Sequence, residues 1–349
     1  MVTNLSHVSS RLVHPTQAED TQQPCLFTRL VDDILLYIGM HFLSHDDIWA
    51  LTLVCRRLSA MFTPLLYNNV QLLLKRTAGR PGAPVNNREA ILLAQKALRS
   101  NLRRRPQLNS NIRSLEWYLD NKEIRDKLYD LLRPMHNLEN LYLCTPYGSP
   151  IIPDHVDTSH SSRLLPRCRR ITIEGIMSLE YAKLLIDPSH IEYIGIDFQP
   201  RWAYPILDWI SSSPAAFTRL QGLQFHFPGG RALNGRTETE LLETWCRTML
   251  AFRTVLREVT IIARVNDSGT FGVSCIQPRQ TKLANIILPE FTKNEWPKLR
   301  RLTLKGFQRK DSQTMEGLRA VIPQVIFDDK LDPSDYLWHN HFAYSPMLR

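Results

Sequence analysis

The chain has 349 residues, of which 43% are hydrophobic and 22% are charged, a composition that excludes disorder over most of its length. The formal net charge is +9, which alone admits a nucleic acid, an acidic protein or an anionic membrane as partner. The strongest basic run, Arg99 with 103–105, ends a predicted helix, where positive charge suits the helix dipole. The remaining charge is spread along the chain, so nucleic-acid binding is kept only as a minor alternative.

The six cysteines form no CxxC pair and no zinc-type spacing, which favours reduced and mostly buried thiols. Residues 1–24 are polar and lack an apolar signal core, so we expect a flexible tail there. No stretch approaches the roughly 20 apolar residues that span a bilayer. We therefore expect no membrane association and a cytoplasmic or nuclear protein.

A dense apolar segment follows the tail. In 26–40, Leu30, Ile34, Leu35 and Ile38 recur at helical spacing. This spacing predicts a helix with one continuous apolar stripe.

A second helical run follows over 48–62. Ser44, followed by Asp46 and Asp47, is the predicted N-cap of this helix, and Pro64 is expected to end the helix. The whole segment 26–62 carries more large apolar residues than so small a unit can enclose. Surplus apolar surface of this kind implies a partner protein or a second domain.

The order of residues in this segment resembles an F-box. The matching positions are Leu30-Val31-Asp32-Asp33-Ile34-Leu35, Ile38, Leu43-Ser44, Asp46-Asp47, Leu51 and Leu53-Val54-Cys55-Arg56-Arg57-Leu58. The chain departs from the family at Val31, where proline is usual, and at Asp33, where glutamate is usual. The loss of proline removes a rigid residue from the helix start.

The resemblance implies that a three-helix F-box, bounded at 25–66, docks on the Skp-type adaptor of an SCF ubiquitin ligase. The implied adaptor contacts are Leu30, Val31, Ile34, Leu35, Ile38, Leu51, Val54, Cys55 and Leu58. The alternative is that these residues are the ordinary core of an N-terminal helical cap.

Beyond Pro64 a different apolar signature recurs, with three apolar residues in the order apolar-x-x-apolar-x-apolar. Its nine copies begin at Tyr67, Ile112, Leu138, Cys168, Ile191, Leu220, Leu256, Leu299 and Ile322. Successive starts are separated by between 23 residues (168 to 191) and 45 residues (67 to 112). Helical-looking stretches lie between many of the copies, so each unit is predicted to be a strand followed by a helix.

This region resembles the irregular leucine-rich repeats of fungal-type F-box proteins. The expected fold class is α/β: an N-terminal three-helix F-box followed by an irregular leucine-rich-repeat solenoid with a curved parallel sheet. The repeats are expected over 67–330, with a tail or cap over 331–349. Another parallel α/β sheet would give the same strand–helix alternation and remains open.

Alternate side chains of such strands point away from the buried face. The outward residues are polar, aromatic and of mixed charge, which suits protein recognition better than phosphate binding. The candidate target-binding residues among them are Tyr118, Tyr142, Arg170, Tyr193, His226 and Arg301. The alternative is a merely solvated sheet face.

Nothing in the sequence predicts catalysis, a metal or a cofactor. Gly-x-Ser-x-Gly, P-loop and dinucleotide-binding patterns do not occur in a strand–turn–helix setting, and His339 with His341 has no ligand partner at suitable spacing. The resemblance implies the substrate-recognition subunit of an SCF-type ubiquitin ligase, which binds an adaptor and an unknown target protein. The alternative is a repeat scaffold or interaction protein without a ligase role.

Overall fold

The structure is a computed structural model that describes residues 30–72, 87–119, 128–144, 164–175, 177–198, 200–227, 235–263, 285–305 and 312–328. The C-terminal segment from 329 and the histidines at 339 and 341 lie outside these residues. The chain divides into two compact units, 1–62 and 63–349, which are described separately below.

The first unit is helical. It contains α2 (Asp32–His41), α3 (His45–Thr52) and the greater part of α4 (Arg56–Asn68). The predicted N-cap at Ser44 is confirmed, because its side chain accepts from the Asp47 backbone N–H while the Asp47 carboxylate accepts from the Ser44 backbone N–H. This reciprocal capping box satisfies two backbone donors that a helix start otherwise leaves without a partner.

The second predicted helical run starts as predicted but differs from the structure in its middle and at its C-terminal end. It is divided into α3 and α4, and α4 continues through Pro64 to Asn68. The prediction that Pro64 ends the helix is therefore wrong. A proline in a helix removes one backbone hydrogen bond, and the other bonds of the helix still hold its turns.

The second unit is built on one open, parallel nine-stranded sheet in which the strands follow chain order from β1 to β9. The strands are β1 (Asn69–Leu72), β2 (Ser114–Tyr118), β3 (Asn140–Cys144), β4 (Arg170–Gly175), β5 (Tyr193–Phe198), β6 (Gly222–Phe227), β7 (Glu258–Ala263), β8 (Arg301–Lys305) and β9 (Gln324–Asp328). The prediction of an α/β fold with a parallel sheet is confirmed.

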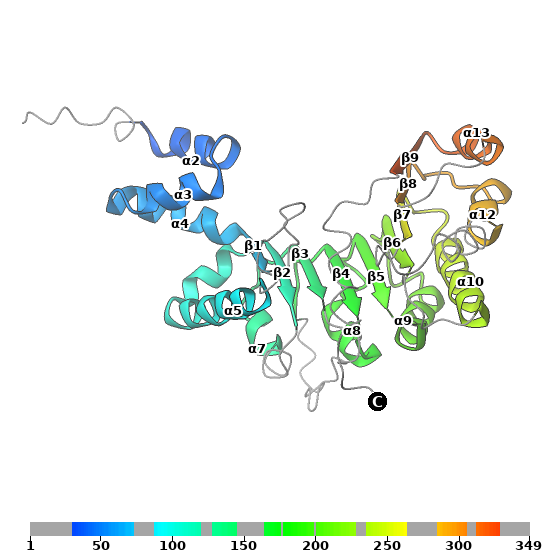
Figure 1. The fold of residues 1–349 in the computed structure, drawn as a ribbon, viewed down its shortest axis with the longest axis horizontal. Helices are drawn as coiled ribbons and strands as arrows, with labels where there is room; N and C mark the ends of the chain where they lie inside the picture. The colour runs from blue at the N-terminus through cyan, green and yellow to red at the C-terminus, as the bar shows by residue number, and fades with distance from the viewer. Residues whose placement is uncertain are drawn as a thin grey trace, which may run out of the picture. The chain divides into compact units, whose positions relative to one another are not determined.

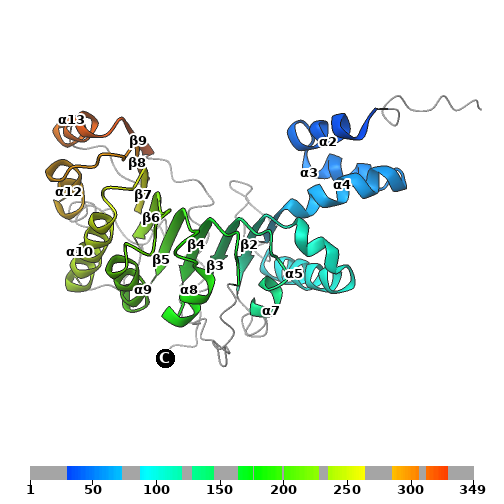
Figure 2. The ribbon, with the colours of Figure 1, turned by 180° about the vertical axis from the view of Figure 1, so that it is seen from behind.

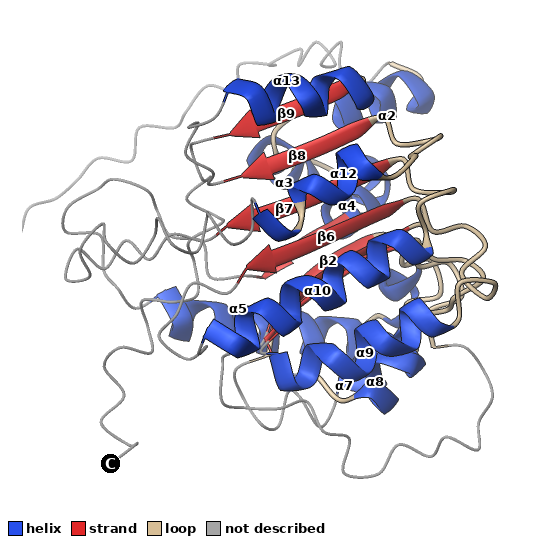
Figure 3. Cartoon of the chain, turned by 90° about the vertical axis from the view of Figure 1, so that its right-hand side faces the viewer, coloured by secondary structure: helices blue, strands red, loops and turns tan. Residues whose placement is uncertain are grey.

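Helices connect most of the strands and pack against one face of this sheet (Figure 3). They are α5 (Asn87–Arg104), the short 3-10 helix η1 (Pro106–Asn111), α7 (Leu128–Leu132), α8 (Leu179–Leu185), α9 (Pro200–Ser212), α10 (Gly235–Ala251), α12 (Leu288–Lys293) and α13 (Ser312–Val321). Figures 1 and 2 show the strands of this unit following an arc with the helices on its outer side.

Each of the nine apolar signatures coincides with one strand. The first apolar residue precedes the strand and is buried in every copy from Ile112 to Ile322, and the other two occupy the second and fourth strand positions. In the register, Leu115 lies beside Leu141, and Leu141 beside Ile171, so equivalent residues stack from strand to strand. A single strand with its helix cannot bury these apolar residues alone, so the core forms by stacking of neighbouring copies.

The residue before each strand also stacks. The backbone carbonyl of Arg113 accepts from the N–H groups of Glu139 and Asn140, and the carbonyl of Glu139 accepts in the same way from Arg169 and Arg170. The side chains of Arg113 and Glu139 form an ion pair along this edge. Repetition of one backbone geometry on successive strands therefore fixes the register of the sheet.

Candidate functional site

Large apolar side chains are exposed on the N-terminal helical unit. Of the ten strongly exposed large hydrophobic residues that the structure describes, all but Leu93 and Val321 lie between residues 31 and 54. They are Val31, Ile34, Tyr37, Met40, Phe42, Trp49, Leu53 and Val54, and together they are called the N-terminal apolar surface below. Clusters of exposed apolar residues on a small unit are typical of protein-interaction sites.

The nine residues proposed as adaptor contacts divide into three groups. Val31, Ile34, Val54 and Cys55 are exposed, whereas Leu30, Ile38 and Leu51 are half-buried. Leu35 and Leu58 are instead in the interior, with 0% and 1% of their surface exposed.

The two interior residues fit the alternative left open by the sequence, in which they belong to the core of a helical cap. A helical unit needs an interior of its own, and Leu35 and Leu58 are buried there, as are Ile48 and Phe62. Their contribution is to the fold of the unit, which holds the exposed residues in place.

Five members of the N-terminal apolar surface were not among the predicted contacts: Tyr37, Met40, Phe42, Trp49 and Leu53. Helical spacing places Tyr37 on the same face as Ile34, and Leu53 lies within the F-box-like motif, so the sequence held a signal for these two. The Tyr37 ring lies 5.9 Å from the Phe42 ring and 4.5 Å from the imidazole of His41, measured between centroids. An aromatic group thus extends this surface beyond the end of α2.

The six candidate target-binding residues lie on the other face of the sheet, at the first, third and fifth strand positions; this is called the polar face below. Arg170 and Arg301 are exposed, and Tyr142 and Tyr193 are half-buried. Tyr118 and His226 are only 4% exposed. Tyr118 packs with Ile91 of α5 and with Cys144, so it is not available as it stands for contact with a partner.

The centre of the polar face is a connected group of side chains. The Arg170 guanidinium lies 5.4 Å from the centroid of the Tyr193 ring and 3.8 Å from a carboxylate oxygen of Glu258. The Tyr193 hydroxyl donates to Gln224 Oε1 at 2.5 Å. Burial raises the pKa of Tyr193 well above its usual range, so the phenol remains a hydrogen-bond donor at neutral pH.

The tyrosine lies in space that a glycine leaves free. A Cβ at Gly222 would be only 2.3 Å from Tyr193 Cδ2 and 2.9 Å from Glu258 Cγ. The absence of a side chain at Gly222 therefore allows residues on β5 and β7 to approach each other across β6.

His226 lies with Glu174 and Asp197 towards the carboxyl ends of the strands. Of these three residues, the sequence analysis singled out only His226, as a candidate target-binding residue. In the part of the chain that is described, no helix is both long and apolar enough to cross a membrane. No family model matches the chain, and no curated protein matches it in sequence.

Proposed function

We propose that this chain is a substrate-recognition subunit of an SCF-type ubiquitin ligase, in which the N-terminal unit is an F-box that binds a Skp-type adaptor. The observation that carries the proposal is the concentration of eight exposed large apolar side chains between residues 31 and 54. These residues fall in the segment whose order of residues resembles an F-box. Burial of such a surface against a partner is the main source of binding free energy in protein complexes.

Aromatic residues give this surface its expected binding hot spots. Trp49 and Tyr37 are 57% and 55% exposed, and buried tryptophan and tyrosine side chains dominate many protein interfaces. Val31, Ile34 and Val54 surround them in sequence and would exclude water from the contact. Val31 also occupies the position at which the family usually has proline.

The repeat unit would bind the target protein on its polar face, in the manner of irregular leucine-rich repeats. Arg170, Tyr193 and Glu258 offer a cation, an aromatic ring and a carboxylate within one connected group. Arginine and tyrosine are enriched at protein interfaces, and mixed charge favours a protein over a polyanion. The chain would act by proximity, since tethering raises the effective concentration of target lysines near the conjugating enzyme.

Co-purification of the full chain with a Skp-type adaptor tests the proposal. The variant to use is Ile34→Asp with Val54→Asp, because both side chains are exposed and the charges leave the interior of the unit intact. Wild type is expected to capture the adaptor and the double variant to lose it. The matched control is Leu93→Asp on α5, an exposed apolar position outside the N-terminal apolar surface, which should capture the adaptor as wild type does.

Failure of wild type to bind the adaptor would exclude the ligase role and favour a repeat scaffold.

A separate experiment addresses the target. Proximity labelling with the full chain is compared between wild type and the variant Arg170→Glu with Arg301→Glu. The variant is expected to label fewer proteins than wild type while still capturing the adaptor. An unchanged set of labelled proteins would place target binding away from the polar face.

A further inference from the structure

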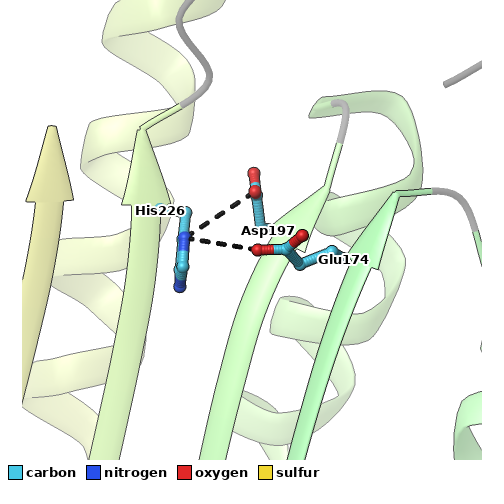
Figure 4. Close-up of side chains that lie close together, drawn as sticks. All are labelled: Glu174, Asp197 and His226. Carbon is cyan, nitrogen blue, oxygen red and sulfur yellow. Dashed lines mark ion pairs between the residues drawn. The ribbon is translucent and has the colours of Figure 1, made fainter. Parts of the chain in front are cut away.

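Three neighbouring strands bring two carboxylates and an imidazole together. Glu174 on β4 is the register partner of Asp197 on β5, and His226 on β6 is one residue beyond the last paired position of its strand with β5. Figure 4 shows the three side chains converging, with His226 Nδ1 lying 3.8 Å from Glu174 Oε1 and 3.7 Å from Asp197 Oδ2. One ligand atom from each residue lies within 4.8 Å of the other two.

All three side chains are removed from solvent. Their exposed fractions are 3% for Glu174, 0% for Asp197 and 4% for His226. Two carboxylates this close repel each other, and burial weakens the screening by water. Positive charge placed between them stabilises such a pair, and a divalent cation supplies it in the most concentrated form.

The spacing suits a shared ion better than direct hydrogen bonds. Both distances from His226 Nδ1 exceed the roughly 3.2 Å limit of an N–H···O hydrogen bond. Ligand atoms that are each about 2.1 Å from one metal ion are separated by about 3–3.5 Å, so a small inward movement completes the site. One imidazole nitrogen with two carboxylate oxygens is a donor set that zinc and manganese accept.

Outer contacts orient two of the three side chains. The Cys144 thiol donates to Glu174 Oε2 at 3.3 Å, which leaves Glu174 Oε1 directed towards the histidine. The Gln224 amide contacts His226 Nε2, and Gln224 is itself held by the Tyr193 hydroxyl. Partners of this kind fix the ring orientation of metal-binding histidines.

The tautomer of His226 depends on that amide. With Gln224 Nε2 donating to His226 Nε2, the neutral ring carries its proton on Nδ1. Rotation of the amide by half a turn presents its oxygen instead, so that it accepts from Nε2–H and Nδ1 becomes the unprotonated ring nitrogen. The Tyr193 hydroxyl can then accept from the amide nitrogen, because a hydroxyl both donates and accepts.

We propose that Glu174, Asp197 and His226 bind one divalent transition-metal ion, of the zinc or manganese class, and that the ion joins β4, β5 and β6. Gln224 is a positioning residue that holds the imidazole with Nδ1 towards the ion. This inference goes beyond the proposed function, since metal binding needs neither the adaptor nor a target protein to be bound.

The test is titration of the metal-free full chain with Co²⁺, followed by visible absorption, and then displacement of Co²⁺ by Zn²⁺. Wild type is expected to bind one equivalent. Each of Glu174→Gln, Asp197→Asn and His226→Gln should weaken the affinity by about 100-fold or more, and Gln224→Ala by about 10- to 100-fold. The control is Glu116→Gln on the polar face of β2. It removes one carboxylate, as Glu174→Gln does, and should leave Co²⁺ binding unchanged.

The melting temperature gives a second readout that needs no variant. Wild type should melt at a higher temperature with Zn²⁺ than after chelation, because an ion that binds only the folded state stabilises it. The proposal is overturned if metal-free wild type takes up no Co²⁺, or if the three ligand variants bind it as well as Glu116→Gln does. The cluster would then be held by the contacts of His226 with Glu174 and Asp197 alone.

Discussion

Arg57 on α4 donates from Nε to Asp32 Oδ1 at 2.9 Å and from Nη2 to the backbone carbonyl of Leu30 at 2.6 Å. These bonds tie α4 to the start of α2. Both charged side chains are well exposed, at 42% and 58%, and exposed pairs contribute only about 0.2–1 kcal/mol. The contact therefore aligns the helices, while the stability of the unit depends on its small interior.

That interior makes a first prediction. Leu58→Ala removes a side chain that is 1% exposed and should destabilise the N-terminal unit by about 2–5 kcal/mol, through lost burial and the cavity left behind. The free energy of unfolding is measured by urea titration, with proteolytic cleavage within residues 30–62 as the signal for unfolding of this unit. Leu53→Ala, at a position 67% exposed, should change stability by less than about 0.5 kcal/mol. Equal effects of the two substitutions would refute this description of the interior.

The capping box at the start of α3 makes the second prediction. Hydrogen bonds from the Ser44 hydroxyl and backbone N–H hold the pKa of Asp47 below its ordinary value of 3.8. Stabilisation by the charged carboxylate is therefore present above pH 3.8 and is lost as the pH falls through the lower folded-state pKa. In an NMR titration, Ser44→Ala should raise the Asp47 pKa towards 3.8. An unchanged pKa would mean that the box does not form in solution.

The polar face makes the third prediction. Gly222→Val should displace Tyr193 and separate it from Arg170, at a cost of about 1–3 kcal/mol, because a Cβ has no room beside the tyrosine ring. Chemical denaturation measures the loss. The contrasting substitution is Gly317→Ala in α13, where the nearest atom would be 3.8 Å away. Gly317→Ala should stabilise the protein by about 0.4–1 kcal/mol. A stabilising effect of Gly222→Val would contradict the close packing of Tyr193 against this position.

Thiol reactivity makes the fourth prediction. Cys55 is exposed, whereas burial raises the pKa of the Cys168 thiol to about 12. In the native protein at pH 8, a maleimide should therefore label Cys55 rapidly and Cys168 only after unfolding, as mapped by mass spectrometry. Saturating adaptor should slow the labelling of Cys55, since it lies in the proposed interface. Unslowed labelling would place Cys55 outside that interface.

The parallel sheet of the second unit could be predicted from the sequence, because each strand requires the same pattern of buried apolar residues. A strand in the middle of a stacked sheet must bury its second and fourth residues, so Leu141 and Leu143 report the strand directly. Every one of the nine copies coincides with a strand. The parallel order follows from the helices between them.

The candidate binding residues were harder to predict, because a linear motif does not say which side of a helix faces inward. Leu35 and Ile34 are adjacent apolar residues of one motif, yet the first is 0% and the second 47% exposed. The association of Glu174, Asp197 and His226 depends on the register of three strands, which no local pattern encodes.

Hydrogen exchange of the full chain, with and without a Skp-type adaptor, tests the central proposal most directly. The adaptor should cover the N-terminal apolar surface, so amides of α2 and α3 should exchange more slowly in the complex. The exchange rates of amides in β2 to β8 should remain unchanged. Protection confined to the sheet, or no protection between residues 31 and 54, would contradict the account.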